Sequence, residues 1–334
     1  MKTEYRKGCE LLDSSLTITN IPDGLEFRVC CYQPEPYRYS DGNKYDIKGE
    51  WYKFQEYRTE LIEKLRNNIP CECDGCVLLK YGHWKIKPEI TQLVMSGGYR
   101  GERCNVKCCY CNTIKIREAS ILKNTFSYMD ILDEIGEFLP NELRFNPIAS
   151  EFTMSPYRKE MFEIIEAKGW YGIFLSNGLL FDDSIAEMMS NKKASVNISV
   201  DAGTSETFAR IKNVDYWDIL IFNLEKYAAT GGDLYLKYVY VEGINDNFDD
   251  IDGFINLAAR LTKHVVISID GAIDGYRARS NITLFDKCCK MMEYFVDSAK
   301  KHGLYCGVSW EYFNENPEFV SLMKKLLETN NRDI

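Results

Sequence analysis

Between about Pro88 and Gly275, short apolar runs alternate with segments of helical periodicity, and this alternation constrains the fold more than any other feature of the chain. The apolar runs lie at residues 90–95, 143–148, 171–176, 194–200, 234–241 and 265–269. Strand and helix patterns that alternate in this way are typical of α/β folds with a parallel sheet. A standard barrel closes with eight such units, so the shorter series predicts a partial (β/α)6 TIM-like barrel.

The remaining sequence falls on either side of this barrel. Residues 1–88 contain many cysteines and aromatic residues but little sustained periodicity beyond one helix at about 50–67, so we expect an irregular domain that a metal centre holds together. Residues 89–275 form the predicted barrel domain. Residues 276–334 are expected to be a helical extension with a strand-like run at 304–310.

Charge and hydropathy exclude some classes of protein. The formal net charge is −9, which argues against nucleic acid as the main partner, because phosphate binding requires a basic surface. No apolar run approaches the length needed to cross a membrane. The first ten residues are charged and have no apolar core of a signal peptide, so we expect a cytoplasmic protein.

Thirteen cysteines, an odd number, do not suit a secreted disulfide scaffold. Three of them follow the first predicted strand with the spacing C-x3-C-x2-C: Cys104, Cys108 and Cys111. Three thiolates on one short loop can hold three irons of a cubane cluster and leave the fourth iron open to a ligand. The alternatives are redox thiols or a zinc site whose fourth ligand is Cys109 or an earlier cysteine.

This loop resembles the signature of the radical SAM superfamily, with Tyr110 at the aromatic position before the last cysteine. The resemblance implies a 4Fe–4S cluster on Cys104, Cys108 and Cys111, with S-adenosylmethionine (SAM) on the open iron. It also implies reductive cleavage of SAM to a 5′-deoxyadenosyl radical, which abstracts a substrate hydrogen. The protein would orient and seal the site, and a flavodoxin- or ferredoxin-type donor would supply the electron.

Other polar residues lie at the carboxyl ends of the predicted strands, where function collects in such barrels. By resemblance to the family, Glu151 would bind the SAM amino group, and Ser199, Asp201 and Arg210 would bind other parts of SAM. The alternatives are an ordinary loop carboxylate, a solvated strand and a surface arginine. Ser176-Asn177-Gly178 resembles a turn of the family but is also a general turn signal.

Two further residues are candidates for catalysis. Lys237 shares a strand face with Tyr235 and Val239, and it is either a functional cation or a solvent-facing lysine. Asp270 ends the sixth predicted strand and is a candidate for substrate contact or proton removal.

The earlier cysteines suggest a second metal site. Their spacing resembles the SPASM-type modules that hold auxiliary 4Fe–4S clusters in radical SAM enzymes, although here the cysteines precede the barrel. The resemblance implies four ligands, with Cys31 and Cys71 as substitutes: Cys9, Cys30, Cys73 and Cys76. Zinc and unliganded thiols are the alternatives.

The leading hypothesis is therefore a radical SAM enzyme with an auxiliary cluster. A peptide is the first expectation for its substrate, because SPASM-like modules often accompany peptide-modifying enzymes. A sugar or small metabolite is the second expectation. A non-catalytic metal-binding scaffold and a tRNA-modifying enzyme are the competing hypotheses, and the acidic composition disfavours the latter.

Overall fold

The computed structural model describes residues 3–21, 24–29, 37–39, 46–74, 76, 78–86, 88–97, 101–111, 126–148, 150–269, 282–308, 321 and 325. The chain divides into two compact units. Unit 1 contains Met1–Arg103 and Asn112–Ile173, and unit 2 contains Cys104–Cys111 and Phe174–Ile334. The cysteine loop thus belongs to unit 2, although it is flanked on both sides in sequence by residues of unit 1.

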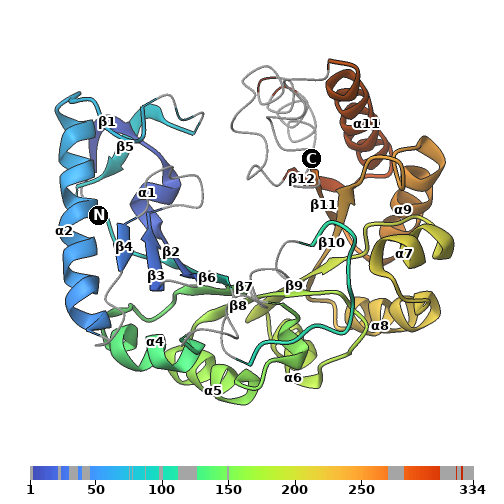
Figure 1. Ribbon diagram of the computed structural model, residues 1–334, viewed down its shortest axis with the longest axis horizontal. Helices are drawn as coiled ribbons and strands as arrows, with labels where there is room; N and C mark the ends of the chain where they lie inside the picture. Colours follow the sequence, from blue (N-terminus) through green and yellow to red (C-terminus); the bar gives the residue numbers. More distant parts are fainter. Residues whose placement is uncertain are drawn as a thin grey trace. The chain divides into compact units, whose positions relative to one another are not determined.

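The main sheet of unit 1 has the order β4-β3-β2-β6-β7-β8 (Figure 1). Its strands are β2 (Ser15–Ile21), β3 (Gly24–Arg28), β4 (Tyr37–Tyr39), β6 (Gln92–Gly97), β7 (Arg144–Ile148) and β8 (Tyr171–Ser176). The last three residues of β8, from Phe174 on, belong to unit 2. Strands β2, β6, β7 and β8 are parallel, whereas β3 and β4 are antiparallel to their neighbours. A separate antiparallel pair joins β1 (Thr3–Gly8) to β5 (Lys80–Lys85).

The helices of unit 1 begin and end where the sequence provides caps. They are α1 (Glu10–Ser14), α2 (Ile47–Arg66), α4 (Tyr128–Ile135), α5 (Arg158–Lys168) and the 3-10 turns η1 (Gly136–Phe138) and η2 (Phe152–Met154). Ser127 and Asp130 form a capping box at the start of α4. Gly169 ends α5 in the left-handed conformation, with φ of 68°, which favours glycine.

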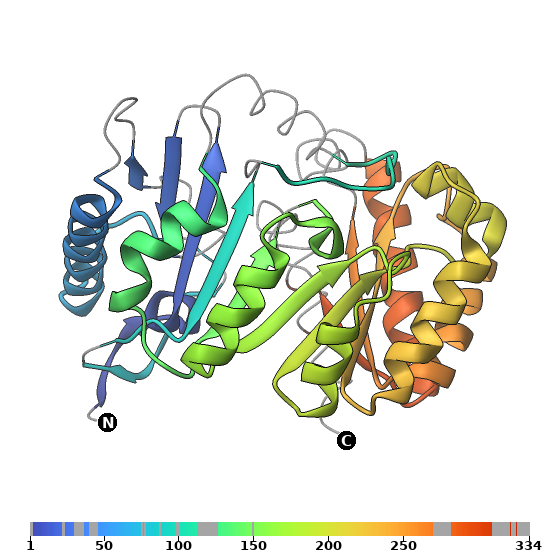
Figure 2. The same cartoon turned by 90° about the horizontal axis from the view of Figure 1, so that it is seen from below.

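Unit 2 repeats the strand–helix pattern. Its parallel strands have the order β9-β10-β11-β12, and they are β9 (Ala194–Ser199), β10 (Asp233–Tyr240), β11 (His264–Ile269) and β12 (Tyr305–Val308). The helices are α6 (Asp183–Ser190), α7 (Ser205–Lys212), α8 (Trp217–Ala229), α9 (Phe248–Leu261) and α11 (Ile282–Lys301). Figure 2 shows α8, α9 and α11 on one side of these strands. The core on that side includes Tyr238, whose ring packs against Phe254 and Phe295.

The structure confirms a mixed α/β fold with a parallel sheet. The six predicted strands correspond to β6, β7, β8, β9, β10 and β11, and the predicted run at 304–310 contains β12. The expected helices at 50–67 and after Gly275 correspond to α2 and α11. No helix in the described part of the chain is long and apolar enough to span a membrane.

The expectation that residues 1–88 are irregular is wrong. Strand β2 lies parallel to β6 and extends the sheet, and Leu16 and Ile18 on it are fully buried. Its sequence, SLTITNI, alternates apolar and polar residues, which is the pattern of a half-buried strand. The alternating pattern of β2 was overlooked because the cysteine-rich composition of this region suggested irregular structure.

Candidate functional site

The loop Cys104–Cys111 is fastened to the carboxyl end of α7 by its backbone. The amides of Lys107 and Cys109 donate to the carbonyl oxygens of Lys212 (3.2 Å) and Ile211 (2.9 Å). Asn213, which ends α7 in the left-handed conformation, donates from its side chain to the carbonyl oxygen of Lys107 at 2.6 Å. These bonds fix the loop at successive residues, so its thiols project from a supported backbone.

The three motif thiols are half-buried, whereas the extra thiol of Cys109 is exposed. The amide of Cys111 donates to the carbonyl oxygen of Cys108 at 3.0 Å and closes a turn between them. The side chain of Asn177 lies 3.8 Å from the sulfur of Cys104 and donates to Asn105 at 2.6 Å. The turn after β8, which resembles a turn of the family and is also a general turn signal, therefore orients the start of the loop.

A buried polar cluster lies beneath the loop. The hydroxyl of Tyr110 donates to Oδ2 of Asp201 at 2.5 Å, and the ammonium of Lys212 forms an ion pair with the same oxygen. The side chains of Lys212 and Asp201 are 1% and 0% exposed, so water screens this pair hardly at all. We call Tyr110, Asp201 and Lys212 the loop anchor.

Asp201 is itself held from several sides. It follows β9 in the left-handed conformation, with φ of 61°, which is unusual for a residue other than glycine. Its Oδ1 accepts from the amide of Val239 at 2.9 Å, and its carbonyl oxygen accepts from Asn245 at 2.9 Å. Both carboxylate oxygens are thus engaged inside the protein, an arrangement suited to positioning Tyr110.

Burial and charge set the electrostatics of this cluster. Burial raises the pKa of the Cys108 thiol to about 11, and the nearby Lys212 ammonium opposes that increase. Burial alone would lower the pKa of Lys212, but the Asp201 carboxylate, together with Cys108 and Cys104, more than offsets this and holds the pKa above its usual value. Lys212 therefore stays charged beneath the loop, where its ammonium favours thiolates.

Two other predicted SAM residues lie in unit 2. Ser199 ends β9 and is half-buried. Arg210 is exposed on α7, and its guanidinium donates to the carbonyl oxygen of Gly243 at 3.0 Å. Sequence reasoning chose Arg210 as the basic residue of this helix and missed Lys212, two residues later in the same last turn.

Glu151 lies in unit 1 and is only 1% exposed. It caps η2 by accepting from the amide (3.3 Å) and hydroxyl (2.8 Å) of Thr153. A second buried acid, Glu102, interacts electrostatically with it and accepts from the Ser155 hydroxyl at 2.6 Å. Burial raises the pKa of Glu102 to about 7. The sequence signal for Glu102, an acid two residues before the cysteine motif, was overlooked.

Of the two candidates for catalysis, Lys237 lies in the described part of the chain and Asp270 does not. Lys237 lies on β10, half-buried, and is paired in register with Ser199 of β9. Asp270 lies outside the described residues.

Three of the four predicted auxiliary ligands lie in the described part of unit 1. Cys9 is buried and caps α1, since its sulfur accepts from the amide of Leu12 at 3.4 Å. Burial raises the pKa of Cys9, and the Cys76 thiol acts on it electrostatically in the same direction. Cys73 and Cys76 belong to one turn, closed by a 3.0 Å backbone bond. Cys30 and its substitute Cys31 lie outside the described residues.

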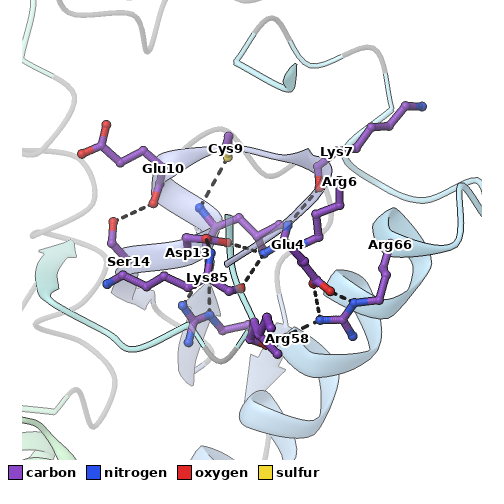
Figure 3. Close-up of polar contacts among 12 residues, drawn as sticks. Glu4, Arg6, Lys7, Cys9, Glu10, Asp13, Ser14, Arg58, Arg66 and Lys85 are labelled. Atoms are coloured by element: carbon purple, nitrogen blue, oxygen red, sulfur yellow. Dashed lines mark hydrogen bonds and ion pairs between the residues drawn. The ribbon is translucent and has the colours of Figure 1, made fainter. Parts of the chain in front are cut away.

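A buried ionic network supports the segment that carries Cys9 (Figure 3). Asp13 accepts from the guanidinium of Arg6 at 2.7 Å and from the amide of Lys85 at 3.0 Å. Arg58 of α2 donates twice to the carbonyl oxygen of Leu12, at 3.1 and 2.8 Å. The network joins α1 to β1, β5 and α2, so the backbone around Cys9 is fixed.

No three His, Cys, Asp or Glu side chains in the described ranges gather as the ligands of one metal ion. A cubane cluster has a different requirement, because each cysteine binds its own iron. The loop supplies three thiols, and those of Cys104 and Cys111 both act on the Cys108 thiol electrostatically. The donor set therefore fits an iron–sulfur cluster.

Residues 99–258 match the family model of the Radical SAM superfamily. GTP 3',8-cyclase of Synechocystis sp. (strain ATCC 27184 / PCC 6803 / Kazusa) is 26% identical over 160 residues, which cover 45% of this chain and 47% of that protein. The chain thus matches about half the length of this curated relative. The family model begins at residue 99 and leaves the earlier cysteines outside.

A solved structure has a similar fold over nearly the whole chain. The crystal structure of Streptococcus suis SuiB bound to precursor peptide SuiA gives a TM-score of 0.52 at 12% identity and covers 96% of this chain and 75% of that chain. At this identity, the likeness concerns the fold alone.

Proposed function

We propose that this chain, whose residues 99–258 match the Radical SAM family model, is an enzyme that reductively cleaves SAM and abstracts a hydrogen atom from its substrate. Cys104, Cys108 and Cys111 would hold the 4Fe–4S cluster. When bound, the cluster supplies the electron that cleaves SAM to a 5′-deoxyadenosyl radical. A flavodoxin- or ferredoxin-type protein is the proposed electron donor.

The observation that carries this proposal is the loop anchor. Tyr110 stands between two motif cysteines in sequence, and its hydroxyl is tied to the buried Asp201–Lys212 pair. Its ring packs against the buried side chains of Ile211 and Val239. These contacts hold the backbone of the loop in place, and the loop presents its three motif thiols together.

The chain's own residues would perform the remaining tasks. Glu151 is the proposed partner of the SAM amino group, and Ser199 and Arg210 are proposed to bind other parts of SAM. We assign Asp201 a positioning role, because its carboxylate oxygens already accept from Tyr110, Lys212 and Val239. The ammonium of Lys212 would stabilise negative charge on the thiolates above it.

A peptide is the proposed substrate. Its support is the fold shared with SuiB, which has been solved bound to precursor peptide SuiA. The alternative is a sugar or small metabolite, which the partial similarity to GTP 3',8-cyclase favours. A non-catalytic scaffold is the third possibility, and the experiment below separates it from both enzymes.

An auxiliary 4Fe–4S cluster in a SPASM-like module is also proposed, with Cys9, Cys30, Cys73 and Cys76 as ligands. Its support is the turn that joins Cys73 to Cys76 and the electrostatic effect of the Cys76 thiol on Cys9. Zinc at the same thiols is the alternative.

Anaerobic reconstitution tests the proposed function. Reduced protein with iron and sulfide is expected to convert SAM to 5′-deoxyadenosine, and replacement of Cys104, Cys108 and Cys111 by Ala should abolish both the conversion and the cubane spin signal. Cys109→Ala is the matched control, since this neighbouring thiol is exposed and should be dispensable. A cubane signal without SAM cleavage would indicate a scaffold and contradict the enzyme.

A further inference from the structure

The face of β9–β12 opposite the helices carries polar side chains in register. Lys237 of β10 is paired with Ser199 of β9 and with Val266 of β11. One step toward the amino ends, Asn197 is paired with Tyr235, and one step toward the carboxyl ends, Val239 is paired with Ser268. Alternate residues of a strand share a face, so Asn197, Lys237 and Ser268 all lie on this side of the sheet.

Three groups on this face have unmet interactions. Lys237 forms no ion pair or hydrogen bond with any described residue. Asn197 Oδ1 and Ser268 Oγ are buried, and neither has a hydrogen-bond partner in the described part of the chain. Buried polar atoms are rarely left unpaired, because the loss of their water is not compensated. Their position on either side of a cation indicates an external ligand.

The spacing of these groups suits an extended peptide. Strands lie about 4.8 Å apart and rise about 3.3 Å per residue, which places each of Asn197 and Ser268 about 8 Å from Lys237 at backbone level. The span of about 16 Å corresponds to about five extended residues. A peptide also provides what the groups lack, since a backbone N–H can donate to Asn197, a carbonyl can accept from Ser268 and a carboxylate can pair with Lys237.

The border of this face toward the amino ends is built of three aromatic rings in a row. Tyr235 and His264 lie with their ring centroids 4.7 Å apart, and His264 and Tyr305 with theirs 5.4 Å apart. Asp233 begins β10 on the same side of the sheet, two register steps from Lys237, and is the acid at that end. A carboxylate of a bound ligand would therefore be attracted by Lys237 and repelled by Asp233.

We propose that this face binds an acidic segment of a peptide, with one carboxylate on Lys237 and the neighbouring backbone on Asn197 and Ser268. The inference rests on the proposed function and gives its substrate a chemical class. It makes Lys237 a specificity residue.

Binding of two short peptides tests the proposal without reductant. The probes are acetyl-Ala-Ala-Glu-Ala-Ala-amide and its Gln counterpart, titrated by ligand-observed NMR against the reconstituted full chain. The Glu peptide is expected to bind about five- to tenfold more tightly, the scale of one charge-assisted contact at a half-exposed site. Lys237→Met should abolish this preference, and Lys237→Arg should preserve it.

Two further arms complete the test. Lys193→Met removes an exposed lysine before β9 and should leave the preference intact, whereas Asn197→Leu should weaken both peptides alike. Equal or absent binding of the two peptides, or a preference that survives Lys237→Met, would overturn the proposal. Glutarate that binds as tightly as the Glu peptide would assign the face to a small acid and also overturn it. Cleavage of SAM by the same preparation is measured separately, so failure of the proposed function is recognised independently.

Discussion

Asp201 is a residue on which an ammonium, a phenol and a backbone amide all converge. Burying such a carboxylate costs free energy, and so does removing it, because its buried partners have no water to take over the lost interactions. Its left-handed backbone places the side chain beneath the cysteine loop instead of along the strand. At the scale of single residues, Asp201 therefore acts as a structural charge that supports the proposed site.

Asp201→Asn is expected to lower the free energy of unfolding by about 3–5 kcal/mol, because it leaves the ammonium of Lys212 buried opposite a neutral amide. Denaturant unfolding of the metal-free protein measures the loss. Adding Lys212→Met should recover part of it, since no unpaired charge then remains. Asp218→Asn, at an exposed position on α8, is the control and should change stability by less than about 0.5 kcal/mol. A loss below about 1 kcal/mol for Asp201→Asn would contradict the role of the anchor.

The sequence could identify Asp201 but not its partners. It marked Asp201 as an inward polar residue at the end of a strand, which is where the structure has it. Lys212 looks like any lysine in the last turn of a helix, where cations are common for other reasons. The fold brings its ammonium to a carboxylate eleven positions earlier in the sequence. No periodic pattern in the sequence predicts this contact.

At the scale of elements, α9 and the turn after β9 approach each other at two glycines. A Cβ on Gly253 would lie 2.5 Å from the carbonyl oxygen of Gly203, a distance that side chains do not tolerate. The helix was predictable from its apolar spacing. The close approach was not, because it depends on a neighbour 50 positions earlier in the sequence.

Gly253→Ala should therefore force α9 away from the turn and reduce the stability of the protein by about 1–3 kcal/mol, as overpacking does elsewhere. Thermal unfolding provides the measurement. Gly136→Ala is the matched control, because a Cβ there meets nothing within 4 Å and the backbone is already right-handed. Equal stabilities of the two variants would show that α9 has room to move.

The row of three rings across β10, β11 and β12, formed by Tyr235, His264 and Tyr305, supports a second prediction at this scale. Burial lowers the pKa of His264 below its usual value of 6.5, because the protonated ring is poorly solvated there. The stability that neutral His264 contributes is thus complete above pH 6.5 and is lost as the pH falls through the lower, folded pKa.

An NMR titration of the His264 imidazole measures this pKa directly. Tyr305→Ala should move the pKa up toward 6.5, since it uncovers one side of the ring, whereas Tyr216→Ala on an exposed loop should not. A pKa at or above 6.5 in the unaltered protein would show that the ring is better solvated than the row suggests.

At the scale of the whole molecule, the strand–helix alternation was readable because hydrophobic periodicity is local. The strands of the first 88 residues were missed in part because β1 and β2 pair with strands far along the sequence, which no local pattern reveals. Composition suggested a metal centre for this region, but it gave no information about the strands.

Two clusters in one chain predict a simple iron count. Full reconstitution should give about eight irons per chain, and replacing Cys73 and Cys76 by Ala should reduce this to about four, because each cubane carries four irons. The motif loop lies in the other compact unit, so its cluster and the cleavage of SAM to 5′-deoxyadenosine are expected to survive as the internal reference. Cys289→Ala, a half-buried thiol of α11, controls for cysteine loss in general. Stoichiometric zinc in the unaltered protein, or an iron count that stays near eight in the double variant, would remove the auxiliary cluster from these thiols.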